Sequence, residues 1–180
     1  RKIEKGDEIA DYMHDYKTGR DTYYFYGLLE GDKGQRAKSS DIDDLMVRSA
    51  VSRSAVFSET NLRSETYYGI TKADGTLLNK GEERAWYAYN YKNNGTEVRN
   101  TTVYSYETSG DREFQRMTRT DTYKGQVADL ESITEEHQST TYYHLDADDP
   151  ATPQDDRKIE KGDEIADYMH DYKTRRDTYY

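Results

Sequence analysis

The sequence predicts an all-β protein, in which successive β-hairpins form an antiparallel meander wound into a spiral sheet, a tube or a filament. Three observations lead to this prediction. Tyrosine-rich runs alternate with other residues at the period of a strand, turn residues follow most of these runs, and the first 24 residues recur almost unchanged at residues 157–180. Period-two alternation punctuated by tight turns favours hairpins over helices.

Tyrosine replaces aliphatic residues as the main source of buried surface. The chain holds 19 Tyr, whereas Leu, Ile, Val and Phe make up only about 13% of it, below the roughly 20% that usually marks disorder. A Tyr ring buries a large apolar surface while its hydroxyl stays hydrated or hydrogen-bonded. We therefore expect a thin, half-exposed core on a long single-layer sheet. The tyrosines expected to form packed rows are Tyr23, Tyr67, Tyr87, Tyr104, Tyr123 and Tyr142.

Turn signals follow the aromatic runs, which recur about every 17–20 residues from Tyr67 onward. Each run is predicted to begin a unit of strand, turn and strand. Segments such as "KADGT", "KNNG" and "ETSGD" place glycine after Asp, Asn or Ser, and Asn-Gly and Asp-Gly supply the positive φ that tight hairpin turns require. The predicted turn glycines are Gly19, Gly75, Gly95 and Gly110.

Two segments fit both strand and helix. In residues 8–18 apolar side chains fall at helical spacing, but "YMHDYKTGRDTYYFY" also fits a hairpin, and we favour strand. Residues 40–60 fit either a strand pair or a short helix.

The near-copy at residues 157–180 indicates tandem duplication with a period of 156 residues. We predict that residues 1–156 form one repeat of about eight hairpins and that 157–180 begin the next. A two-copy protein with decorated ends and an engineered overlap are the alternatives. The copies differ only at Gly19 and Arg175, so either the turn has negative φ there or other contacts offset the strain. Such repeats stack in one dimension, and near-identical interfaces give a helical assembly with neighbouring copies as partners.

Three segments resemble the YD repeats of Rhs and teneurin proteins: "YAYNYKNNGTEVRN", "YSYETSGDREFQRMT" and "HDYKTGRDTYY". The residues that match the repeat pattern are Tyr89, Tyr91 and Gly95 in one unit, Tyr104, Tyr106 and Gly110 in another, and Asp15, Gly19 and Arg20 in part of a third. Asn90 and Glu107 depart from the Asp of the pattern. The resemblance implies hairpins wound into a hollow shell or tube, with toxin encapsulation, adhesion or a wall-associated role.

Composition excludes several classes of function. A net charge of −10 argues against nucleic acid, whose phosphates require a basic face, and against an anionic membrane surface. No apolar run is long enough to span a membrane, and the absence of Cys excludes disulfides and thiolate chemistry. Motifs for a nucleophile elbow, a phosphate loop or a dinucleotide site are absent. We therefore predict that the chain is not an enzyme.

Two kinds of ligand site remain as candidates. Asp146, Asp148 and Asp149 alternate in the loop "LDADDP", where carboxylates are suited to Ca²⁺ but also fit a solvated acidic loop. No other cofactor is expected. Asn94 and Asn100 begin N-glycosylation sequons, so attached glycans are a second candidate.

These patterns predict a structural repeat of a secreted microbial surface filament or tube, extracellular or on the cell surface, built by stacking tyrosine-rich hairpins. One alternative is an adhesin stalk or carbohydrate-binding surface that uses exposed Tyr and Trp86. The other is a YD-type shell that encloses a toxin domain.

Overall fold

The computed structural model describes residues 9–72, 74–108, 115–144 and 164–180. The predicted fold class is confirmed, because the described residues form an all-β antiparallel meander. The strands pair in sequence order from β1 to β11, except that the short β3 pairs with β2 beside this path. The chain divides into two compact units, residues 1–101 and 102–180.

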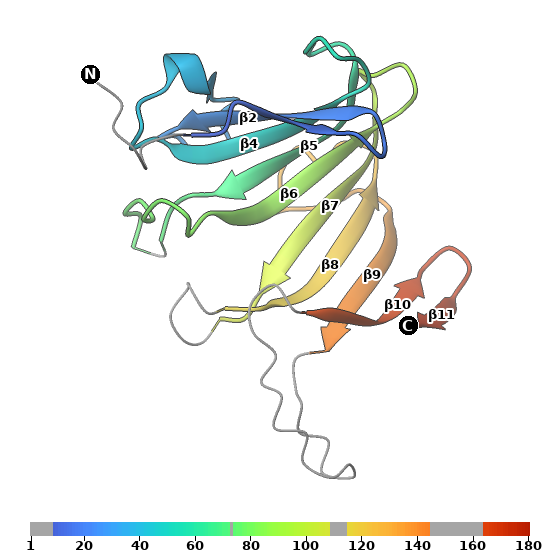
Figure 1. Ribbon diagram of the computed structural model, residues 1–180. Coiled ribbons are helices and arrows are strands. Elements are labelled where there is room, and N and C mark those ends of the chain that lie inside the picture. Colours follow the sequence, from blue (N-terminus) through green and yellow to red (C-terminus); the bar gives the residue numbers. More distant parts are fainter. Residues whose placement is uncertain (1–8, 73, 109–114, 145–163) are drawn as a thin grey trace. The chain divides into compact units, whose positions relative to one another are not determined.

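Figure 1 labels most of these elements. The strands are β1 (Tyr12–Asp15), β2 (Arg20–Gly27), β3 (Gln35–Arg36), β4 (Leu45–Ser52), β5 (Leu62–Gly69), β6 (Arg84–Tyr91), β7 (Val98–Tyr106), β8 (Met117–Lys124), β9 (His137–His144), β10 (Ile165–Asp171) and β11 (Arg176–Tyr179). A single 3-10 turn, η1 (Ala37–Ser39), interrupts the strands in the described part of the chain.

The first unit buries side chains on both faces of β4. One cluster consists of Tyr23, Phe25, Ala50 and Leu62, with Phe57 and Tyr91 packed against it. A second cluster consists of Leu45, Val47, Ile70 and Leu78. Figure 1 shows β2, β4, β5 and β6 side by side, and each of the three pairings between these neighbours contains a register shift of the β-bulge type. Similar shifts occur in the β8–β9 and β9–β10 pairs of the second unit.

From Tyr67 to Tyr142, each aromatic run lies in one strand and the next run lies in the next strand, so the expected unit of strand, turn and strand at every run is not found. "ETYYG" lies in β5 and "AWYAYNY" in β6, and the two strands pair with each other. The spacing of about 17–20 residues therefore corresponds to one strand and the loop that follows it.

Both segments that the sequence left open contain strands. β1 lies within residues 8–18, so the helical alternative there is wrong and the favoured hairpin is correct. Residues 40–60 contain the single strand β4, which pairs with β2 on one side and β5 on the other. Its β-branched residues Val47 and Val51 suit a strand that has neighbours on both sides.

Gly19, Gly75 and Gly95 all have positive φ, while Gly110 lies outside the described residues. Gly95 is the most constrained of the three. A Cβ atom there would lie 2.8 Å from Asn61 Cα and 2.9 Å from the Thr60 carbonyl oxygen. Only glycine fits this close backbone approach without a shift of the neighbouring loop.

The two copies of the 24-residue segment fold into the same hairpin. In the first hairpin, β1–β2, Tyr12 pairs with Tyr23. In the second hairpin, β10–β11, Tyr168 pairs with Tyr179. The turn residue that differs has φ 64° in Gly19 and φ 54° in Arg175. The suggestion of negative φ is therefore wrong, and Arg175 occupies the left-handed region that disfavours side chains.

We expect Arg175→Gly to stabilise the second hairpin by about 1 kcal/mol, because glycine adopts positive φ without steric cost. The main-chain N–H of Tyr180 donates to the Asp167 carbonyl at 3.0 Å, so hydrogen exchange at Tyr180 should slow by roughly fivefold. The reverse change, Gly19→Arg, should accelerate exchange at Tyr24, whose N–H makes the matching bond to Asp11. Equal exchange rates in wild type and both variants would contradict the strain at Arg175.

Candidate functional site

Tyr67 and Tyr87, two of the predicted row tyrosines, stack on each other. Their ring centroids lie 4.7 Å apart with an interplanar angle of 12°, on β5 and β6 at paired positions. Tyr89 meets both rings edge-on, at 6.0 Å from Tyr67 and 5.2 Å from Tyr87. Tyr23 belongs to a different stack, with its ring 5.8 Å from Tyr12 on β1.

On β4, the next position of the Tyr67–Tyr87 row is occupied by Arg48 and not by an aromatic residue. Strand pairing places Arg48 between Phe25 on β2 and Tyr67 on β5. Only 1% of the Arg48 side chain is exposed, and its guanidinium carbon lies 4.0 Å from the centre of the Phe25 ring. Sequence reasoning missed this residue. The signal that could have found it is strand alternation. Arg48 and Ala50 are two residues apart, so their side chains lie on the same face of β4, the face that packs with Tyr23 and Phe25.

Two carboxylates compensate the buried charge of Arg48. Its Nη1 donates to Glu65 Oε2 at 3.0 Å, and its Nη2 donates to Glu59 Oε1 at 2.7 Å. The hydroxyls of Tyr67 and Tyr91 both donate to the second oxygen of Glu65. Burial raises the pKa of Glu59, but the hydrogen bonds and charges of Arg48 and Lys33 together outweigh burial and leave this pKa below its ordinary value. The cluster is thus an interior ion pair with tyrosine hydroxyls around it.

The tyrosines of this cluster resist ionisation. Burial is the largest cause that raises the pKa of Tyr67, and the negative charge of Glu65 raises it further. Burial followed by the hydrogen bond to Glu65 raises the pKa of Tyr91. Burial likewise raises the pKa of Tyr87. All three hydroxyls therefore remain neutral hydrogen-bond donors at any physiological pH.

The second unit stacks rings around β9. The His137 ring lies 4.6 Å from the Tyr123 ring and 4.2 Å from the Tyr172 ring, and both pairs are stacked. Tyr142 stacks on Tyr168 at 4.7 Å with an angle of 16°. Tyr123 and Tyr142 were predicted as row residues, but each packs on a partner that the sequence did not single out.

A buried carboxylate also lies beneath this second stack. Asp121 on β8 accepts a hydrogen bond from the Thr140 hydroxyl at 2.6 Å. Arg119 Nε lies 3.0 Å from the same carboxylate, and His137 Nε2 lies 3.3 Å from it. The described part of each unit therefore combines aromatic stacking with a hydrogen-bonded charged group in its interior, although the Nε of Arg48 is buried in the first unit without a hydrogen-bond partner.

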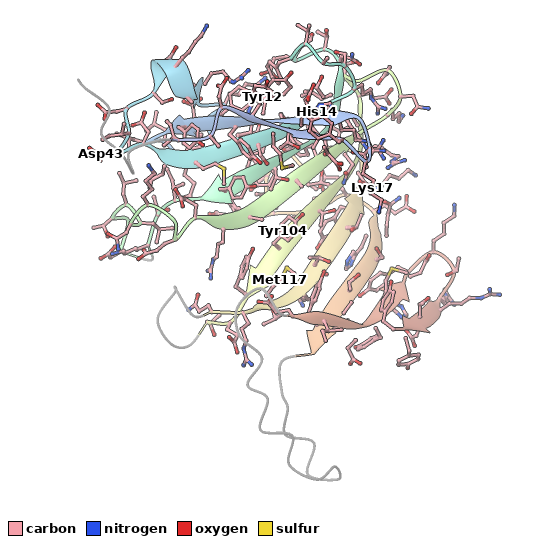
Figure 2. All side chains as sticks on the ribbon, in the orientation of Figure 1. Tyr12, His14, Lys17, Asp43, Tyr104 and Met117 are labelled. Carbon is pink, nitrogen blue, oxygen red and sulfur yellow. The ribbon has the colours of Figure 1, made fainter. Side chains whose placement is uncertain are left out.

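The remaining predicted sites are scattered. Tyr104, which Figure 2 labels, lies on β7 and is half-buried. Asn94 is exposed in the turn after β6, whereas the side-chain oxygen of Asn100 on β7 is buried with no hydrogen-bond partner in the described structure. Trp86 is 38% exposed and meets Tyr87 edge-on.

The candidate calcium ligands Asp146, Asp148 and Asp149 lie outside the described residues. Within the described ranges, His, Asp and Glu do not gather in groups of three or more that could hold a metal ion. No helix in those ranges is long and apolar enough to cross a membrane.

Comparison with known proteins finds no matching family model, no matching curated protein and no matching solved structure. The likeness to YD repeats thus rests on the residues quoted above.

We expect Arg48→Met to destabilise the protein by about 3–5 kcal/mol, because Glu65 would remain buried without its cation. The double variant Arg48→Met/Glu65→Leu should recover part of this loss. Lys124→Met is the matched control, since it breaks an exposed pair with Glu136 that is worth at most about 1 kcal/mol. Urea unfolding measures all three changes, and an equal loss in Arg48→Met and Lys124→Met would contradict the role of the interior pair.

We also expect stability to fall steeply above pH 10. In the unfolded chain these tyrosines ionise near pH 10, whereas burial raises the pKa of Tyr67 in the folded state. The folded state then holds more protons, so the free energy of unfolding falls with rising pH by about 1.4 kcal/mol per pH unit for each such tyrosine. Tyr67→Phe keeps the ring and should reduce the slope by about one proton.

Urea unfolding at intervals between pH 9 and 12 measures this slope. Ile70→Val is the control, because it removes packing from the aliphatic cluster with Leu45 and Val47 without removing a titrating group. It should lower stability equally at every pH. An unchanged slope in Tyr67→Phe would show that this hydroxyl is not protected by folding.

Proposed function

We propose that this chain is a structural repeat of a secreted microbial surface filament or tube, assembled lengthwise from tyrosine-rich strands. One observation carries the proposal. The two copies of the hairpin have the same strand pairing, but the second strand is the more buried one in the first copy, and the first strand is the more buried one in the second copy. In the first hairpin β1 is largely exposed and β2 largely buried. In the second hairpin β10 is mostly half-buried and β11 fully exposed.

The covering strands explain this difference. β4 lies against β2 in the first hairpin, and β9 lies against β10 in the second. A chain that continued with the same period would place a β9 strand beside every β1 and a β4 strand beside every β11. Both strands of every hairpin would then be covered, as is expected for repeats that bury surface only against neighbours.

The stacked aromatic pairs between strands support a structural role. Cross-strand aromatic pairs contribute roughly 0.2–1 kcal/mol each, and a periodic chain repeats that contribution along its length. The likeness to YD repeats adds the expectation that the continuing sheet winds into a spiral or tube. An acidic surface, with a net charge of −10, opposes lateral association until salt screens it.

A carbohydrate-binding or adhesin surface is the second candidate. The observation that favours it is Trp86, a large aromatic ring left 38% exposed next to Tyr87. Sugar rings pack their apolar faces on such side chains. A YD-type shell around a toxin domain is a third candidate that rests on the resemblance alone.

Electron microscopy of the purified chain at rising protein and salt concentration tests the proposal. We expect uniform fibres with a constant axial repeat, which become more frequent as salt screens the acidic surface. A chain that sediments as a monomer under all these conditions would overturn the proposal. Discrete closed cages would favour encapsulation, and glycan-array binding that is lost in Trp86→Ala would favour the adhesin.

A further inference from the structure

We propose that the edge of β1 on which no described strand pairs accepts the β9 strand, residues His137–His144, of another copy of this sequence, in the register that β10 already uses. The inference rests on the proposed lengthwise assembly and specifies its junction. β1 is the first strand in the pairing order, and β2 is its partner in the sheet. β10 has the same sequence over residues 168–171 as β1 over residues 12–15, but β10 has β9 on its second edge.

The pairing within the second unit defines the expected register. Tyr142 pairs with Tyr168 and Thr141 with Met169. Subtracting the period of 156 residues places Tyr142 of one copy opposite Tyr12 of the next, and Thr141 opposite Met13. The Tyr142–Tyr168 ring stack at 4.7 Å is then reproduced on Tyr12, whose side chain is 58% exposed in the first hairpin.

The main-chain groups of β1 already have the direction that this pairing requires. The carbonyls of Asp11 and Asp15 accept hydrogen bonds from Tyr24 and Gly19, so these two residues face the β2 side. In an antiparallel strand the alternate residues face the other edge, which places the N–H and C=O of His14 on the open edge. Figure 2 labels Tyr12 and His14 on this strand.

Tyr16, which follows β1, already has the conformation of its counterpart Tyr172. Tyr16 meets His14 at 4.6 Å and 79°, and Tyr172 meets His170 at 4.6 Å and 78°. Tyr16 nevertheless is 92% exposed, against 43% for Tyr172. The neighbour that covers Tyr172 is β9.

That cover consists of one ring stack and one hydrogen bond. The His137 ring stacks on Tyr172 at 4.2 Å, and the Tyr172 N–H donates to the Gln138 carbonyl at 2.9 Å. The ring and the N–H of Tyr16 can receive a β9 strand with little rearrangement of the first hairpin, which lowers the entropic cost of binding.

The two hairpins therefore compete for one position on β9. Within a chain the second hairpin holds it, helped by its high effective concentration. That hairpin carries Arg175 at positive φ, whereas the first hairpin has Gly19 there. The first hairpin of a neighbouring chain is thus the less strained occupant, and exchange between chains extends the sheet in the manner of a domain swap.

Disulfide trapping tests this junction, because the chain has no cysteine of its own. Met169 and Thr141 form a non-hydrogen-bonded pair of the antiparallel ladder. The Cα atoms of such a pair lie about 4.5 Å apart, a separation that a disulfide can bridge. The variant Met13→Cys/Thr141→Cys is refolded from urea at high concentration and oxidised in a glutathione buffer. We expect a ladder of covalent dimers and longer oligomers on a non-reducing gel.

Two matched variants are run beside it. Thr141→Cys/Met169→Cys should close within one chain and confirm the register of β9 on β10. Met13→Cys/Gln138→Cys places the second thiol three positions along β9 and on its opposite face, so it should give several-fold less intermolecular product.

The proposal is overturned if the internal control fails to close, or if Met13→Cys/Thr141→Cys yields no more oligomer than the mispaired variant. Microscopy of the same samples separates this failure from that of the proposed function. Uniform fibres without the cross-link would contradict only the proposed junction at β1. The absence of both fibres and cross-link would contradict the proposed filament as well.

Discussion

Contact between rings on neighbouring strands is the interaction on which this sheet depends. Aliphatic side chains form a buried cluster around Val47 and Ile70, and rings on paired strands supply much of the remaining buried surface. Tyr67 on Tyr87 and Tyr142 on Tyr168 are flat stacks between adjacent strands. Such contacts join a strand only to its neighbours, so the fold is stabilised step by step along the strand order, as in repeat proteins.

A thin aromatic core has a second consequence, which is that charged groups enter it. Arg48 lies under the Phe25 ring and pairs with Glu65, and Asp121 is held by Thr140 and Arg119. Tyrosine hydroxyls donate to the buried carboxylate of Glu65. Polar networks of this kind rigidify a structure when every member is satisfied and weaken it when one is lost. Aromatic rings with a polar end make the combination feasible.

The sequence was sufficient to predict the fold class and several turns. Alternating tyrosines identified β5, β6 and β9, and the turn signal "KTG" predicted the first hairpin against a helical alternative. These features depend on local periodicity and on the φ of single residues, which a sequence displays directly. Arg48 and Asp121 were missed because charge argues for exposure, and only the pairing across strands shows that they face the interior.

The ring partners of Tyr123 and Tyr142 were missed for the same reason. Tyr123 packs on His137 and Tyr142 on Tyr168, and those partners depend on which residue lies opposite on the next strand. Register is a non-local property set by turn length and bulges. A regular spacing of tyrosines along the chain therefore located strands well but did not determine which rings meet.

The bulges described in both units have a further effect on growth. Each adds an unpaired residue to one strand and increases the right-handed twist at that step. Strands twisted in this way do not lie flat against a second sheet, and flatness is what cross-β bundles need. The register shifts therefore disfavour flat, face-to-face packing of this tyrosine-rich surface on a second copy.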